Sequence, residues 1–115
     1  MFSKLGYDFF MMDSRGHGQS GGKTVHVPSV DAVVDDVAGF SKFVIKELYS
    51  PSQGFDCPPD VFISAHSFGC MQLLNLLLKN NLVIEVDDIR APIKAVSFTC
   101  PFWDFGAKKS IAALL

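Results

Sequence analysis

Charge of one sign never accumulates along this sequence, and no apolar stretch is long enough to cross a bilayer. Ten Lys and Arg residues against twelve Asp and Glu give a net charge of −2 over 115 residues, a balance that argues against nucleic-acid binding. The longest apolar stretches, such as 71–78, fall far short of the roughly 18 residues that a transmembrane helix needs. The N-terminus also has no secretory signal pattern. We therefore expect no nucleic-acid partner, no transmembrane segment and a cytoplasmic location.

Cysteine is scarce as well, and its spacing excludes two further classes of protein. The three cysteines, Cys57, Cys70 and Cys100, form neither a CxxC pair nor a pattern with paired histidines. An odd set of this kind fits neither a disulfide framework nor a zinc site. We expect reduced thiols, with Cys70 packed in a core. We also expect no metal and no organic cofactor.

Apolar residues are abundant, and their periodicity predicts alternating strands and helices. Hydrophobic residues make up 49% of the chain, enough for one small core or part of a larger one. Short apolar runs bounded by turn residues predict strands, and apolar residues at i, i+3, i+4 and i+7 predict helices. The expected elements are a strand over 7–12, a helix over 29–48, a strand over 61–64, a helix over 70–80 and a strand over 93–99.

This alternation is typical of βαβ units in a parallel sheet, so the predicted fold class is α/β, with a βαβαβ order. Residues 50–60 hold three prolines and a glycine and are expected to form a surface loop. Residues 84–90 carry three acidic side chains, and we expect an exposed connection or a short helix there.

One short motif carries chemistry, the five residues Ala65-His66-Ser67-Phe68-Gly69 (65–69) between the strand VFIS and the following helix. In this context the pattern predicts a nucleophile elbow, a strained strand-to-helix turn that exposes a serine. Ser67 would be the nucleophile, and the backbone N–H of Phe68 would donate to the oxyanion. Ala65 and Gly69 are small where strand and helix meet, and the His66 side chain would point away. The competing interpretation is that Ser67 only caps the helix.

A second motif strengthens the first. Residues 13–20, DSRGHGQS, follow the predicted first strand directly and are similar to the D-x-R-G-H-G-x-S loop of the α/β-hydrolase superfamily. The segments GYDFFMMDSRGHGQSGG, SVDAVVDDVAGF and VFISAHSFG resemble the lysophospholipase and monoacylglycerol lipase branch, which includes serine aminopeptidase-like hydrolases. The resemblance covers about Gly6 to Phe102. It departs from the usual motif at Ala65, where glycine is more common.

The resemblance implies structural roles for the loop. Its two glycines are expected to adopt backbone conformations closed to other residues, and Arg15 and His17 are expected to hold the loop by hydrogen bonds. His17 is a poor candidate for the catalytic base, because the family places that base after the last strand. The loop residues with expected structural roles are Asp13, Arg15, Gly16, His17, Gly18 and Ser20.

What the family requires and this sequence lacks is equally informative. The family order is Ser, then Asp or Glu, then His, but no histidine follows Ser67. The second oxyanion donor would come from a loop preceding Met1. Asp104 follows the third predicted strand, yet without a histidine to orient it resembles an ordinary loop carboxylate. We therefore expect residues 1–115 to be an incomplete α/β-hydrolase domain, a central fragment that is unstable and inactive alone.

The resemblance implies cleavage of small-molecule carboxylic esters, lipid-like ones in particular, with amides left open and with room for a peripheral membrane contact of the parent protein. An aromatic cluster near the expected cap region is compatible with a lipid substrate and equally with core packing. Its members are Phe98, Phe102, Trp103 and Phe105. The alternative is a non-catalytic remnant that binds a partner through unpaired strand edges. An anion-binding loop at 16–22 is disfavoured, because no helix is predicted directly after its glycines.

Overall fold

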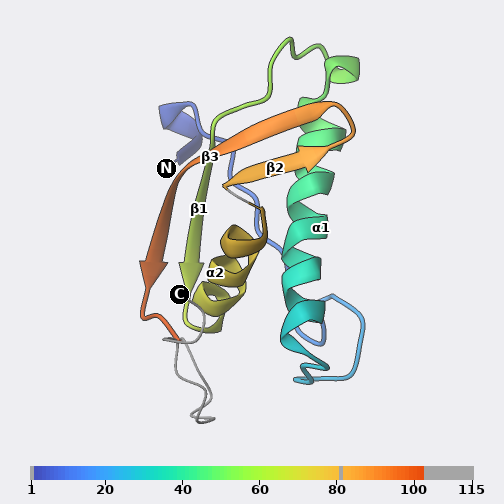
Figure 1. Ribbon diagram of the computed structural model, residues 1–115, viewed down its shortest axis with the longest axis vertical. Helices are drawn as coiled ribbons and strands as arrows, with labels where there is room; N and C mark the ends of the chain where they lie inside the picture. The colour runs from blue at the N-terminus through green and yellow to red at the C-terminus, as the bar shows by residue number, and fades with distance from the viewer. Residues whose placement is uncertain (1, 81, 103–115) are drawn as a thin grey trace.

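The described part of the chain folds into a three-stranded sheet and two helices, as the computed structural model shows (Figure 1). The structure describes residues 2–80 and 82–102. The helices are α1 (Val30–Tyr49) and α2 (Phe68–Asn80), and the strands are β1 (Val61–His66), β2 (Val83–Val86) and β3 (Ile89–Thr99). Two short 3-10 helices, Phe2–Leu5 and Pro51–Gln53, complete the elements. The predicted α/β class is confirmed.

The sheet has the order β1-β3-β2 and is mixed rather than wholly parallel. β1 and β3 run parallel, joined through α2, whereas β2 and β3 form an antiparallel hairpin. The register shifts between Val61 and Phe62, which pair with Ile93 and Ala95. Lys94 is thereby left over on β3, as in a β-bulge. The parallel pair brings the carboxyl ends of β1 and β3 together beside the start of α2.

α1 begins where the sequence provides a cap. Ser29 has extended backbone, and its hydroxyl accepts a hydrogen bond from the Ala32 N–H at 3.1 Å, which satisfies one of the free donors of the first turn. Asp31 in the first turn and Lys46 in the last match the helix dipole. The buried stripe of α1 faces α2 and the sheet, with Val33, Val34 and Ile45 each at most 3% exposed.

The helices cover one face of the sheet and leave the other open. Ile63 and Ala65 on β1 pack with Val34 of α1 and Leu73 and Leu76 of α2. A second cluster joins Ile45 to the hairpin residues Ile84, Ala91 and Ile93. Alternate residues of β1 point away from both clusters, and Phe62 is 54% exposed. Parallel strands are ordinarily buried on both faces, whereas among the described residues Phe62, Ser64 and His66 of β1 are exposed.

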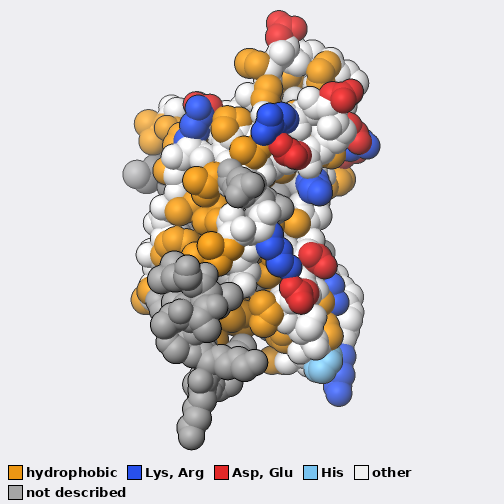
Figure 2. All heavy atoms as spheres, in the orientation of Figure 1, with side chains coloured by type: hydrophobic (Ala, Val, Ile, Leu, Met, Phe, Trp, Pro, Cys, Tyr) orange, Lys and Arg blue, Asp and Glu red, His pale blue; other side chains and the backbone are white. Residues whose placement is uncertain are grey.

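Apolar exposure extends beyond the sheet. Figure 2 shows hydrophobic side chains gathered over the part of the molecule where β1, β3 and α2 lie, with charged side chains more frequent toward α1. Phe9, Met11 and Val25 are each more than 60% exposed. Such surface is far more than scattered single side chains. Among the described helices, none has the length and apolar character needed to cross a bilayer.

The predicted strand over 7–12 is wrong for the structure described. These residues are extended but are assigned to no strand, and all except Met12 are exposed. Tyr7 touches Phe62 of β1 edge-on, with ring centroids 5.9 Å apart, and Asp8 accepts a hydrogen bond from the Tyr49 hydroxyl. The physical reason is that a strand exists only with a partner. No described strand hydrogen-bonds to this segment.

The interpretation of 84–90 as a connection or short helix is also wrong. β2 and the start of β3 occupy this stretch, joined by a turn in which Asp87 has a φ of 51°. Ile84 is buried on the inner face. Glu85 and Arg90 pair across the strands on the exposed side, at 2.9 Å. These charged side chains lie on the solvent-facing side of the hairpin. Because the hairpin includes the start of β3, this strand begins four residues before the predicted strand at 93–99.

Candidate active site

Ser67 occupies a single-residue turn between β1 and α2. Its φ is 52°, in the left-handed region that residues other than glycine seldom adopt. The Ser67 N–H donates to the carbonyl of Thr99 at 3.0 Å. The Ser67 carbonyl in turn accepts from the N–H groups of Cys70 at 3.0 Å and Phe102 at 3.2 Å. Both sides of the strained residue are thus fixed, as a strained conformation requires, and Ser67 itself is exposed.

The residues that flank Ser67 meet at ordinary van der Waals distance. A Cβ built on Gly69 lies 3.9 Å from the Ala65 Cβ and 3.9 Å from the Gln72 Oε1. One methyl at position 69 therefore fits, while a larger side chain would push against β1. Ala65 is compatible with the turn.

Phe68 is the first residue of α2, so its backbone N–H lies in the first turn of that helix. The positive end of the α2 dipole lies at the same place. The Phe68 ring stands 6.3 Å from that of Phe102, centroid to centroid. A donor, a helix dipole and two aromatic rings are consequently gathered beside the Ser67 turn.

His66 points across the sheet and not along the chain. Its Nδ1 lies 3.1 Å from the Thr99 Oγ1, and the Thr99 hydroxyl donates to the Ala65 carbonyl at 3.2 Å. The buried Cys70 thiol donates to the same Ala65 carbonyl at 3.3 Å and to the Thr99 carbonyl at 3.6 Å. Sequence reasoning missed Thr99 altogether, and it saw Cys70 only as core packing.

The loop over 13–20 folds around Asp13. The Asp13 Oδ2 accepts from the Gln19 N–H at 2.9 Å, and the Asp13 carbonyl accepts from the Ser20 hydroxyl at 2.7 Å. Gly16 and Gly18 have φ values of 72° and 51°. A Cβ on Gly18 would collide with the Asp13 carboxylate, and one on Gly16 with the carbonyl oxygen of Lys23. Both positions require glycine for their φ and for space.

Arg15 ties this loop to α1. Its guanidinium donates to both carboxylate oxygens of Asp36, at 2.5 and 2.6 Å, and to the Ala32 carbonyl at 3.3 Å. The hydrogen bond from Arg15 holds the pKa of Asp36 below its usual range, and Asp36 raises the pKa of Arg15. The His17 Nδ1 lies 3.1 Å from the Arg15 carbonyl. Asp36 is a second residue that sequence reasoning missed, having seen it only as a charge near a helix start.

The constellation around Ser67 is incomplete within the described residues. No hydrogen bond there joins the Ser67 hydroxyl to a histidine; His17 and His66 have the partners given above. Asp104, Trp103 and Phe105 lie outside the described residues. Across 2–80 and 82–102, no group of three or more His, Cys, Asp or Glu side chains could hold a metal ion.

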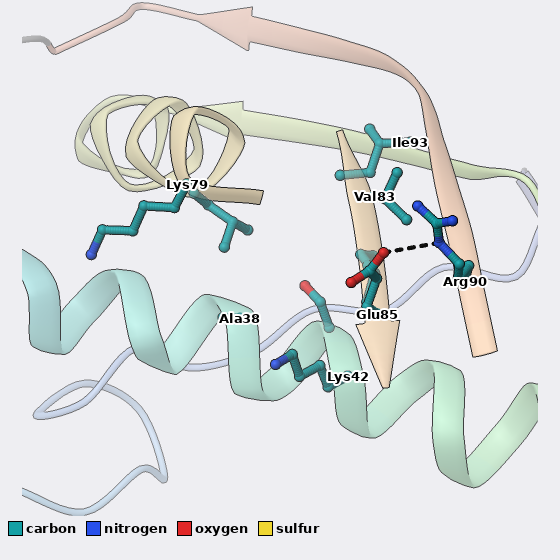
Figure 3. Close-up of a pocket in the computed structure, with 10 residues that line it drawn as sticks. Ala38, Lys42, Lys79, Val83, Glu85, Arg90 and Ile93 are labelled. Carbon is teal, nitrogen blue, oxygen red and sulfur yellow. Dashed lines mark ion pairs between the residues drawn. The ribbon is translucent and has the colours of Figure 1, made fainter. Parts of the chain in front are cut away.

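A cavity of about 250 Å³ lies elsewhere, between the two helices and the hairpin (Figure 3). Lys42, Lys79 and Arg90 stand around it, and Leu76 and Ile93 contribute apolar walls. Lys79 pairs with Asp31 of α1 at 2.6 Å. None of the cavity residues belongs to the Ser67 turn or to the 13–20 loop, so the cavity is separate from the candidate active site.

Comparison with known families decides the assignment. The family model described as serine aminopeptidase, S33, matches residues 1–97. The chain belongs to this family. The match includes both the 13–20 loop and the Ser67 turn. The S33 family belongs to the α/β-hydrolase superfamily, so this chain is of the hydrolase type. Its three-stranded sheet and two helices are consistent with an incomplete α/β-hydrolase fold. No curated protein and no solved structure gives a significant match.

Proposed function

We propose that Ser67 is the nucleophile of a serine hydrolase that cleaves carboxylic esters. The observation that carries the proposal is the φ of 52° at Ser67, on a one-residue turn from a strand into a helix. Strain of this kind persists only where the surroundings enforce it, and it clusters at functional sites. A serine that merely capped α2 would ordinarily have extended backbone, as Ser29 has at the start of α1.

In the proposed reaction the Ser67 Oγ attacks the acyl carbonyl carbon while a base removes its proton. The carbonyl oxygen becomes an oxyanion, and the Phe68 N–H donates to it with the support of the α2 dipole. As the tetrahedral intermediate collapses, the protonated base gives its proton to the departing oxygen, so the alcohol leaves neutral and an ester remains on Ser67. Water then attacks this acyl-enzyme and releases the acid. The route uses a hydroxyl nucleophile, a general base and backbone N–H donors, which are all groups that a protein provides, so we propose no metal and no organic cofactor.

The 115-residue polypeptide alone is proposed to be inactive. The sequence contains no histidine after Ser67, and the described residues offer its hydroxyl no base. Within the described residues, the face of the sheet that carries Phe62, 54% exposed, is also covered less than the faces of a parallel sheet ordinarily are. We expect the isolated polypeptide to show no cooperative unfolding transition and no ester turnover. A sharp transition together with turnover would refute this proposal.

Lipid-like acyl esters are the proposed substrates. Phe68 and Phe102 place two aromatic rings beside Ser67, where they would contact an apolar acyl chain. Amide or peptide bonds are the competing substrate class. The free thiols of Cys57 and Cys100, both exposed, support a reducing, cytoplasmic setting, and a peripheral contact with membranes would give access to lipid substrates.

A non-catalytic role is the second candidate, favoured by one observation. In the part of the chain that the structure describes, β1 is an edge strand, and the exposed Phe62 lies on it, so another strand could pair there. In that case the chain would act by binding a protein partner.

Hydrolysis assays on the natural protein that carries this sequence separate these candidates. We expect turnover of a monoacylglycerol or lysophospholipid, weak turnover of an aminoacyl anilide, and loss of activity in Ser67→Ala. Ser64→Ala is the matched control, because Ser64 is an exposed serine on β1 with ordinary strand backbone. Preference for the anilide would move the substrate class to amides. No Ser67-dependent turnover of either would favour the binding role.

A further inference from the structure

Thr99, the last residue of β3, contacts three consecutive residues that end at Ser67. Its backbone carbonyl accepts from the Ser67 N–H at 3.0 Å. Its hydroxyl donates to the Ala65 carbonyl at 3.2 Å, and its Oγ1 lies 3.1 Å from the His66 Nδ1. Thr99 therefore has a hydrogen-bond contact with each of the last two residues of β1 and with Ser67 in the turn.

Proton counting gives these contacts a direction. A threonine hydroxyl has one proton to donate, and the Ala65 carbonyl receives it. The contact with His66 then requires the Nδ1 to donate to Oγ1, which leaves the ring Nε2 as an acceptor when the imidazole is neutral. From the helix side, the Cys70 Sγ lies 3.3 Å from the Ala65 carbonyl oxygen and 3.6 Å from the Thr99 carbonyl oxygen, so its one proton is shared between the two carbonyls. The two strand ends are thus joined from both sides.

We propose that Thr99 is a positioning residue for Ser67. By holding Ala65 and His66 in register, its hydroxyl keeps the Thr99 carbonyl in line with the Ser67 N–H and maintains the left-handed backbone at Ser67. The directions of the Ser67 Oγ and the Phe68 N–H both depend on that backbone. The catalytic consequence rests on the proposed function, whereas the hydrogen bonds do not.

The test compares isosteric changes in the natural protein that carries this sequence. Thr99→Val removes the hydroxyl and keeps the shape, Thr99→Ser keeps the hydroxyl, and Thr24→Val changes the other threonine of the chain, an exposed loop residue. The readouts are the second-order rate of labelling of Ser67 by a fluorophosphonate probe, the melting temperature, and hydrogen exchange of the Ser67 amide. A neutral hydrogen bond corresponds to about a three- to tenfold change in rate.

We expect Thr99→Val to label about three- to tenfold more slowly, with faster exchange at the Ser67 amide, and Thr99→Ser and Thr24→Val to label at about the wild-type rate. Wild-type labelling with no effect of Thr99→Val would overturn the positioning role and leave the proposed function standing. A slow rate that Thr99→Ser fails to restore, or that simply follows a lower melting temperature, would also overturn it. A wild-type protein that never labels at Ser67 would overturn the proposed function itself.

Discussion

Replacing Ser67 by glycine should make the protein more stable while it removes the nucleophile. Ser67 has a φ of 52°, and its side chain is exposed. Glycine adopts this backbone without the steric cost that a Cβ imposes. The same change at an ordinary strand position has the opposite effect, because glycine loses more conformational freedom on folding.

The expected magnitude follows from these two opposing contributions. Left-handed backbone costs a residue with a Cβ about 1–2 kcal/mol, and the extra chain entropy of glycine costs about 0.5–1 kcal/mol. The free energy of unfolding of Ser67→Gly should therefore exceed that of Ser67→Ala by up to about 1.5 kcal/mol. Ser64 on β1 lacks the strain, so Ser64→Gly should fall below Ser64→Ala by about 0.5–1 kcal/mol.

Urea unfolding of the four variants, made in the natural protein that carries this sequence, measures the difference. The midpoint should rise from alanine to glycine at position 67 and fall at position 64, with unchanged slopes. Both Ser67 variants should be inactive. If the glycine variant were less stable than the alanine variant by the same amount at positions 67 and 64, Ser67 would carry no backbone strain. The physical basis for its assignment as nucleophile would then fail.

Two further predictions concern titration. Burial, and then the hydrogen bond to Asp8, raise the pKa of Tyr49 to about 12. Above about pH 10 the folded state keeps a proton that the unfolded state loses, so the free energy of unfolding should fall as the pH rises. Ultraviolet titration should show a lower pKa of Tyr49 in Asp8→Asn. Arg15 lowers the pKa of Asp36, so their pairing stabilises the protein above the ordinary carboxyl pKa and is lost as the pH falls through the lowered value. Arg15→Lys loses the two-pronged contact and should shift acid unfolding to higher pH; an identical acid transition would contradict the pairing.

The features that sequence reasoning identified well are those set by neighbouring residues. Ser29 and the apolar stripe that follows it are local signals for α1. The turn at Ser67 is equally local, since a short strand, a serine with a small residue two positions away on each side, and a helix are adjacent in the chain. Gly16 and Gly18 follow the same rule, because a tight loop imposes its left-handed backbone on the residues within it.

The features it missed depend on residues far away in the chain. The stretch 7–12 has the composition of a strand, but composition cannot provide a partner to pair with. In β2 the charge of Glu85 suggested solvent, whereas hairpins on one side of a core alternate charged and apolar residues. Asp36 meets Arg15 across 21 positions, and Thr99 meets His66 across 33. No periodicity in the sequence signals either contact.

The most direct test of the central claim is covalent labelling of Ser67. A fluorophosphonate probe would be added to four samples: the natural protein that carries this sequence, the isolated 115-residue polypeptide, and the Ser67→Ala variant of each. Peptide mass spectrometry would then locate the modified residue. The account predicts labelling at Ser67 in the natural protein, none in its variant and none in the isolated polypeptide. Failure of the natural protein to label, or labelling at another serine that persists in Ser67→Ala, would contradict it.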